Sequence, residues 1–414
     1  MDGIHTMELR ALSRLVPAPE KFMANRPIRP EVWSIPDDSV PGLFGLAELD
    51  RILTSGLPSD RHLRVFDRGE QVPRERYVWG GRAPSGMLRG ELRSHAVNGL
   101  VRSGATLALN ELEYLSEPIG DLCRRLALET GQNVNAGAFL TPAGSVGLSA
   151  HPDVEAVLLI QTHGSKVWRM WEPAWRDPLG HERDRKLLAE ETERVEQGAP
   201  DLEVTLRTGD VLWIPRGWLH GAVTTGEPSL HVTLGFISYT RYWLANEIVR
   251  GLDARLAGAD GFRADLPWGV AGDPEGLGAE VGETVEELIA ALGRLDHTDV
   301  SARVRRSMRT RYLPPRRSQP ISTAVGPGVG LETRVVMVTE AVSGADRLAD
   351  GRLRLNLRDT ALTVPSGAAD WVETRWARDA ADTWSARDLV PPLDEAAAVA
   401  LVSAMLREGV VRAI

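Results

Sequence analysis

Two histidines and one aspartate are spaced along the chain as metal ligands would be. His151 and Asp153 are separated by a single residue, and His220 follows much later. Two imidazoles and one carboxylate, carried on strand-like sequence, form the ligand set that holds a divalent iron on one face and leaves the opposite positions open. Such residues also recur by chance in unrelated chains, so the surrounding sequence has to show whether these three are metal ligands. We interpret them as the iron ligands of a non-haem oxygenase.

Turn-forming sequence precedes both ligand positions. Residues 141–150 are mostly small and lead into His151, and the turn at 215–217 separates two strand-like runs just before His220. Both turns would place their ligands at the start of a strand, inside the mouth of a barrel, where binding sites commonly lie. The two halves of the ligand set are therefore predicted to meet there.

Tryptophan is abundant in this chain, with 12 residues, and many of them lie near the predicted site. Most are expected to pack in the core. Trp218, close to the second histidine, is a candidate for the wall of a substrate mouth. Its neighbour Arg216 is expected to be a solvated turn residue rather than a substrate-binding one.

Short strand-like runs alternate with turn residues between positions 133 and 239. The runs lie at 134–140, 156–161, 166–171, 204–206, 211–214 and 230–237. Regularly spaced short strands with Gly and Pro between them predict an antiparallel barrel or jelly roll. The charged insert at 177–200 is expected to be a solvated helical excursion between strands. The predicted fold is therefore mainly β plus α, with a jelly-roll core.

The first part of the chain is expected to wrap this core. Residues 1 to about 60 are rich in proline and carry the aromatic residues Phe22, Trp33 and Phe44. Such a composition is typical of a segment that packs on a larger domain instead of forming its own core. Within it, apolar residues at helical spacing predict a helix over 46–53.

A strand and a long helical run are predicted before the first ligand. The strand pattern covers 62–66, and the helical pattern begins at 107 and ends at Gly131. Pro118 interrupts the helical pattern, so two helices are expected, the second starting at the proline. Cys123 has apolar neighbours and no activating partner nearby, which predicts a buried structural thiol.

Helical patterns return after the strands. One apolar face comprises Leu244, Ile248, Val249 and Leu252, and another comprises Val285, Leu288, Ile289 and Leu292. Helices added to a β core either form a dimer interface or pack on their own barrel. The sequence alone leaves both possibilities open.

A linker rich in Pro and Arg at 313–320 marks a further boundary. Beyond it, strands are predicted at 334–338 and 352–358, and an amphipathic helix that leads to a short strand at 394–411. The expected domains are a catalytic domain with its wrapping segment, a helical region and a small C-terminal module, at 1–240, 241–312 and 313–414.

Composition narrows the class of protein. The 414 residues carry a net charge of −9, which argues against general electrostatic binding of nucleic acid. A single cysteine excludes an intrachain disulfide and fits a reducing compartment. No apolar run is long enough to cross a membrane, and the start lacks the pattern of a signal peptide. We expect a cytoplasmic enzyme without a membrane partner.

The motifs resemble a known family. Gly209, Pro215, Gly217 and His220 match the second cupin motif in spacing. The longer strings at 141–171, 210–220 and 231–233 are similar to JmjC-type oxygenases, most closely the ribosomal oxygenase branch and its bacterial cupin-like relatives. The resemblance implies a double-stranded β-helix core, a helical dimerisation region that would make the protein a homodimer, and a C-terminal winged-helix module.

The same resemblance implies roles for single residues. It assigns the iron ligands to His151, Asp153 and His220, places Lys166 against the distal carboxylate of 2-oxoglutarate, and lets His231 line the site. An ammonium on a barrel strand is costly to bury without an anionic partner, which agrees with the role of the lysine.

Two positions depart from the family pattern. Phe139 stands where the family commonly has a tyrosine that shares the distal carboxylate, and Gly137 stands where it has an asparagine. Neither residue can donate a side-chain hydrogen bond. Other contacts to the co-substrate, and a different substrate pocket, are therefore expected.

The leading hypothesis is an Fe(II)- and 2-oxoglutarate-dependent oxygenase that consumes O₂ and hydroxylates a side chain of a protein or peptide. Ribosomal protein as the substrate rests on the resemblance alone, and demethylation of a methylated side chain uses the same chemistry. A metal-dependent cupin enzyme that does not use 2-oxoglutarate, and a binding module with a vestigial iron site, are the alternatives. Lys166 discriminates between them, because only the first class needs it.

Overall fold

The computed structural model describes most of the chain. The described residues are 10–35, 43–56, 58–80, 90–183, 186–310, 328–338, 341–342, 344–357, 360–377 and 383–414. The predicted linker at 313–320 lies outside the described residues. Tyr239–Tyr312 form a compact helical unit that is distinct from the rest of the chain.

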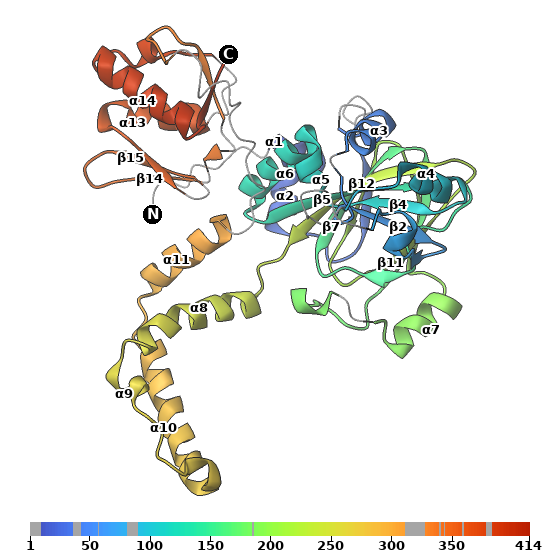
Figure 1. The fold of residues 1–414 in the computed structure, drawn as a ribbon, viewed down its shortest axis with the longest axis horizontal. Helices are drawn as coiled ribbons and strands as arrows, with labels where there is room; N and C mark the ends of the chain where they lie inside the picture. Colours follow the sequence, from blue (N-terminus) through green and yellow to red (C-terminus); the bar gives the residue numbers. More distant parts are fainter. Residues whose placement is uncertain are drawn as a thin grey trace. The chain divides into compact units, whose positions relative to one another are not determined.

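Two antiparallel sheets form the core of the first part of the chain (Figure 1). The strands are β1 (Glu31–Ser34), β2 (Leu63–Asp67), β3 (Glu70–Gln71), β4 (Thr106–Leu109), β5 (Asn133–Thr141), β6 (His151–Pro152), β7 (Ala156–His163), β8 (Ser165–Trp171), β9 (Leu202–Arg207), β10 (Asp210–Ile214), β11 (Leu219–Thr224) and β12 (Ser229–Ile237). The larger sheet has the order β1-β10-β7-β12-β5-β4-β2-β3, and the smaller one has the order β6-β11-β8-β9. This mixed α/β, antiparallel architecture is cupin-like, as the strand pattern predicted.

Strands β7 and β10 are buried on both faces. Leu159 and Leu212 pack with Trp168 and Met170 of the smaller sheet, while Leu158 belongs to the cluster on the helical side. Alternate side chains of a strand point to opposite faces. A strand covered on both sides therefore needs a continuous apolar run, and the sequence of β7 supplies one.

Helices and the N-terminal segment cover the larger sheet. They are α1 (Arg10–Ser13), α2 (Pro19–Ala24), α3 (Leu46–Thr54), α4 (Ser94–Arg102), α5 (Leu112–Leu115) and α6 (Glu117–Thr130). Phe22 and Phe44 are buried in the same cluster as β5 and β12, and Trp33 packs against it, so the predicted wrapping is confirmed. The break near Pro118 is also confirmed, and Cys123 is fully buried, as expected.

One element differs from the sequence prediction. The helical pattern was expected to begin at 107, but residues Thr106–Leu109 form β4, all of whose residues are buried between its neighbours. A short run that is apolar on both faces has no periodicity, so a strand cannot be told from a helix there. Strand β11, which carries the second histidine, begins just after the turn at 215–217, where the sequence placed a strand start.

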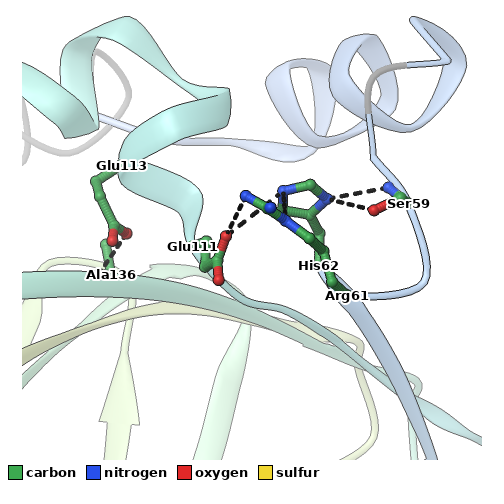
Figure 2. Close-up of polar contacts among 6 residues, drawn as sticks. All are labelled: Ser59, Arg61, His62, Glu111, Glu113 and Ala136. Carbon is green, nitrogen blue, oxygen red and sulfur yellow. Dashed lines mark hydrogen bonds and ion pairs between the residues drawn. The ribbon is translucent and has the colours of Figure 1, made fainter. Parts of the chain in front are cut away.

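A group of polar contacts ties the start of β2 and helix α5 to the sheet (Figure 2). His62 accepts a hydrogen bond from the backbone N–H of Ser59 at Nδ1 (3.0 Å), and Arg61 pairs with Glu111 (2.9 Å). Glu113 of α5 accepts the backbone N–H of Ala136 in β5 (2.9 Å). Burial raises the pKa of the Glu113 carboxyl to about 7.

The Glu113 carboxyl should make folding pH-dependent near neutrality. Its pKa in the fold, about 7, lies above its ordinary value of 4.5, so the fold favours the protonated acid. Its stabilising contribution is full below pH 4.5 and is lost as the pH rises through 7, an effect of about 2–3 kcal/mol. Denaturant melts of Glu113→Gln should lack this decline, while the exposed control Glu117→Gln should keep it. A decline of equal size in Glu113→Gln would contradict the assignment.

The helical unit comprises α8 (Arg241–Leu256), α9 (Asp260–Arg263), α10 (Pro274–Gly293) and α11 (His297–Thr310). Thr240 caps α8 by accepting the backbone N–H of Trp243 (3.0 Å), and Asp273 caps α10 by accepting that of Gly276 (3.1 Å). Across Pro274–Gly293, all of which the structure describes, no residue is buried. The apolar face of α10 is therefore not covered by the other helices of this unit.

The C-terminal part has a hydrophobic cluster of its own, which includes Trp384, Val402 and Met405. Its elements are β13 (Val335–Met337), β14 (Gly344–Arg347), β15 (Leu353–Asn356), β16 (Ala361–Val364), α13 (Ser366–Ala377), α14 (Glu395–Arg407) and β17 (Val411–Ala413). The strands predicted near 334–338 and 352–358 are confirmed, as is the terminal helix with its strand. None of the helices that the structure describes combines the length and the apolar composition needed to cross a membrane.

Candidate metal centre

The fold brings His151, Asp153 and His220 together. One ligand atom from each lies within 4.8 Å of those of the other two. The cause is the register of β6 and β11, which places the two histidines directly opposite each other, with ring centroids 4.6 Å apart. The aspartate follows β6, and its carbonyl accepts the backbone N–H of Gly217 (2.8 Å), which fixes it to the turn before β11.

Backbone carbonyls orient both imidazoles. Nδ1 of His151 lies 2.8 Å from the carbonyl oxygen of Ser149, and Nδ1 of His220 lies 3.0 Å from that of Trp218. A carbonyl oxygen only accepts, so each Nδ1 carries the proton and each Nε2 keeps a lone pair. Such a contact fixes the tautomer and ring orientation of a histidine that binds a metal.

The two Nε2 atoms face the same carboxylate. Nε2 of His220 is 3.5 Å from one oxygen of Asp153, and Nε2 of His151 is 3.9 Å from the other. Burial, and then the neighbouring His151, lower the pKa of His220, which keeps the buried imidazole neutral. The side chains of His151 and Asp153 remain about one-third exposed (37% and 32%), so one side of the centre is open to solvent. The donor set fits a divalent metal with free positions on its open side.

Lys166 lies on β8 opposite Thr224 of β11, and only 2% of its surface is exposed. Its Nζ donates to Oγ1 of Thr141 (3.0 Å) and lies 5.5 Å from the ring centroid of Trp168. Among the residues that the structure describes, no carboxylate pairs with it. Burial lowers the pKa of the ammonium to about 7. This side chain would gain from an anionic ligand.

His231 lies on β12 and is 3% exposed. Its ring stacks on Phe139 with centroids 5.0 Å apart, and Trp168 contacts it edge-on at 5.3 Å. Burial, then the charge of Lys166, lowers the pKa of His231 well below its usual range, so the ring is neutral. Within the described part of the chain, its Nδ1 and the Nε1 of Trp168 have no hydrogen-bond partner. Buried polar atoms of this kind are uncommon and point to a missing ligand or water.

Two neighbours of the centre are held by distant parts of the chain. Trp218 is 6% exposed, and its indole N–H donates to the carbonyl of Ile28 (3.2 Å). Arg216 is not solvated, because it pairs with Asp177 (3.1 Å) and only 18% of its side chain is exposed. Both partners are distant in the sequence, and no local pattern signals them.

Comparison with known proteins agrees with the geometry. The model of a protein family described as the JmjC domain matches residues 115–244, a range that includes all the residues of the candidate centre. The chain contains a JmjC domain. The family resemblance proposed from the sequence is thereby confirmed.

Two curated proteins are similar to part of this chain. The bifunctional lysine-specific demethylase and histidyl-hydroxylase NO66 of Dictyostelium discoideum is 34% identical over 169 residues, which cover 40% of this chain and 32% of that protein. Ribosomal oxygenase 2 of Mus musculus is 29% identical over 194 residues, covering 46% and 38%. The chain thus spans about a third of the length of these relatives.

Solved structures extend the similarity in fold. The ribosomal oxygenase YcfD of Escherichia coli, in complex with cobalt and succinic acid, has a TM-score of 0.52 at 15% identity, and the match covers 95% of this chain and 97% of that one. Another structure of E. coli YcfD has a TM-score of 0.54 at 15% identity, covering 95% and 98%. At 15% identity this similarity concerns the fold alone. It covers the JmjC domain and the regions that follow it.

Proposed function

We propose that the chain is an Fe(II)- and 2-oxoglutarate-dependent oxygenase that uses O₂ to hydroxylate a side chain of a protein or peptide. One observation carries the proposal: two Nε2 lone pairs and a carboxylate converge in the same domain as a fully buried lysine that has no counter-ion among the described residues. The first feature fits an iron site, and the second fits a co-substrate with a free carboxylate. The names of the relatives, which include ribosomal oxygenase and histidyl-hydroxylase, support the same class of reaction.

His151, Asp153 and His220 would hold the metal. Bound iron with 2-oxoglutarate and O₂ supplies the oxidising power that the protein's own side chains lack. The carbonyls of Ser149 and Trp218 keep both imidazoles in the ligating tautomer. The open side, next to His151 and Asp153, whose side chains are about one-third exposed, is where a substrate side chain would enter.

Lys166 would bind the distal carboxylate of 2-oxoglutarate. Thr141 holds the ammonium in place and would share the carboxylate through its hydroxyl. The ring of His231 stacks on Phe139, which has no hydrogen-bonding group. Nδ1 of His231, which has no partner among the described residues, would supply the missing donor. Leu159, Met170 and Leu212 form the apolar interior beside this pocket and exclude water from it.

The experiment that tests the proposal supplies the purified protein with Fe(II), 2-oxoglutarate and a tryptic or intact ribosomal protein mixture. We expect succinate release that depends on the substrate, and a gain of one oxygen on a peptide detected by mass spectrometry. Loss of a methylene mass would instead identify a demethylase, the first of the two activities in the name of the Dictyostelium relative. Turnover that is independent of 2-oxoglutarate would refute the proposed class.

We also infer that the helical unit joins two copies of the chain. Helix α10 presents exposed apolar side chains at spacings of three and four residues, which form one face: Leu277, Val281, Val285, Ile289 and Leu292. Val249 of α8 and Trp268 are exposed as well. A contiguous apolar face of this kind is typical of an interface. The division into 1–240, 241–312 and 313–414, and a winged-helix-like character for the last of these, belong to the same proposal.

Charges on the α10 face should break the dimer. In the double variant Val285→Glu, Ile289→Glu, two carboxylates would be buried without partners in the interface, so we expect a monomer at micromolar concentration where the unmodified chain is a dimer. Multi-angle light scattering after gel filtration measures the mass. The control Glu283→Lys changes the charge on the opposite face of the helix and should leave the dimer intact. An unmodified chain that is already monomeric would refute the inferred interface.

A further inference from the structure

A pocket of about 680 Å³ lies beside the metal centre but does not include its ligands. We call it the arginine pocket. Its walls come from the N-terminal segment at 22–29, from residues 172–177 after β8, and from the turn between β10 and β11. Four of its lining residues are arginines: Arg26, Arg29, Arg176 and Arg216.

The N-terminal wall of the pocket is held rigidly. The indole N–H of Trp213 donates to the carbonyl of Pro27 (2.9 Å), and that of Trp218 donates to the carbonyl of Ile28 (3.2 Å). Phe22 packs edge-on against Trp213, with ring centroids 4.9 Å apart. Two consecutive residues are thus fixed by their backbone, while the side chain of Ile28 is 83% exposed. A segment fixed in this way loses little conformational entropy when it binds a partner.

The charges of the pocket are unbalanced. Arg176 pairs with Glu172 (2.6 Å) and Arg216 pairs with Asp177 (3.1 Å). Both carboxylates of the pocket are therefore occupied. The remaining arginines, Arg26 and Arg29, are exposed and make no ion pair or hydrogen bond within the described part of the chain. Two free guanidinium groups flank an exposed isoleucine, in a chain whose net charge is −9.

The pocket shares its turn with the metal centre. Arg216 and Trp218 line the pocket. Between them, the backbone N–H of Gly217 donates to the carbonyl of Asp153, and the carbonyl of Trp218 accepts from His220. A ligand in the pocket would therefore lie against the turn that orients two of the three candidate metal ligands.

We propose that the arginine pocket binds an acidic polypeptide segment in which an apolar residue lies between two carboxylates. Carboxylates would pair with Arg26 and Arg29, for which the guanidinium group offers two parallel donors. The apolar residue would cover Ile28. That this segment belongs to the protein substrate of the centre rests on the function proposed above, whereas binding itself does not. The enzyme would then prefer protein substrates that carry acidic residues at a distance from the side chain that it modifies.

The test uses the full-length protein and a fluorescein-labelled peptide with repeated Glu-Leu-Glu units, followed by fluorescence anisotropy without iron or 2-oxoglutarate. We expect saturable binding that weakens at least tenfold in the double variant Arg26→Glu, Arg29→Glu. These side chains are exposed and without described partners, so the fold should be unaffected. The control Arg102→Glu reverses an exposed charge at the end of α4, outside the pocket, and should bind as the unmodified protein does.

Charge reversal of the peptide completes the design. A Lys-Leu-Lys peptide should bind the double variant better than the unmodified protein. Equal binding of the acidic peptide to both proteins, or none to either, would overturn the proposal. Displacement of the peptide by inorganic phosphate beyond the effect of sodium chloride at equal ionic strength would also overturn it, in favour of a phosphate site. Because no turnover is measured, a negative result leaves the proposed oxygenase activity standing, and an inactive enzyme leaves peptide binding standing.

Discussion

Replacing Asp153 by alanine is expected to abolish turnover and to lower the affinity for Fe(II) by more than about 100-fold, since even outer-shell partners of metal ligands contribute 10–100-fold. The carboxylate is the only anionic member of the group, and it lies 3.5 Å from Nε2 of His220 and 3.9 Å from that of His151. Without it, a divalent cation would meet two neutral imidazoles, with no ligand charge to balance its own.

Anaerobic calorimetry with Mn(II) or Co(II) measures this effect independently of turnover. The control Glu203→Ala removes an exposed carboxylate of β9 that pairs only with Arg169 among the described residues, and it should bind metal normally. The same loss is expected for His220→Ala, whose imidazole is 5% exposed and held by Trp218. Unchanged metal affinity in Asp153→Ala would place the metal elsewhere.

The ligand set could be recognised from the sequence because its positions follow from local rules. Turn residues before His151 and before His220 place each at a strand start, and antiparallel pairing then brings the strands together. The strands β5, β7, β8, β9, β10 and β12 were predictable for the same reason, since their apolar patterns repeat at short, regular intervals. A buried Lys166 could also be anticipated, because the alternate residues on its face of β8, Trp168 and Met170, are aromatic and apolar.

The parts that could not be predicted depend on contacts between distant segments. The partners of Arg216 and Trp218 are Asp177 and Ile28, which come from a loop and from the N-terminal segment. Likewise, the arginine pocket joins Arg26 to the turn after β10, and no sequence window contains both. Strand β4 was not predicted, because its four residues are buried on both faces and show no alternation of apolar and polar residues. Tertiary environment, and not local propensity, decides such positions.

Replacing Lys166 by methionine is expected to have two opposite effects. Binding of 2-oxoglutarate should fall by about 100-fold or more, because a buried charge pair is lost and the distal carboxylate would face an apolar wall. The protein without ligand should nevertheless become more stable. Burial lowers the pKa of the lysine from 10.5 to about 7, which means that the fold disfavours the ammonium. Methionine has a similar length and no charge, so the gain should be about 2–4 kcal/mol near neutral pH.

Thermal melts with and without 2-oxoglutarate, in the presence of Mn(II), measure both effects at once. Lys166→Met should melt higher than the unmodified protein and lose the rise in melting temperature that the ligand produces. The exposed control Lys21→Met should change neither. If the methionine variant melted lower and still responded to 2-oxoglutarate, the lysine would be a structural residue and the co-substrate would bind elsewhere.

The sign of the pH dependence gives an independent check on the same residue. A lysine whose pKa in the fold is about 7 is mostly neutral above that pH, so it must take up a proton before it can pair with a carboxylate. The dissociation constant of 2-oxoglutarate should therefore be nearly constant below pH 7 and rise about tenfold for each unit above it. Calorimetry in buffers of different ionisation enthalpy should record the uptake of close to one proton at pH 8 and much less at pH 6. If no proton is taken up at pH 8, the lysine is already charged in the free protein, which would contradict the lowered pKa. A buried ammonium in the free protein would need a counter-ion, and the described residues do not supply one.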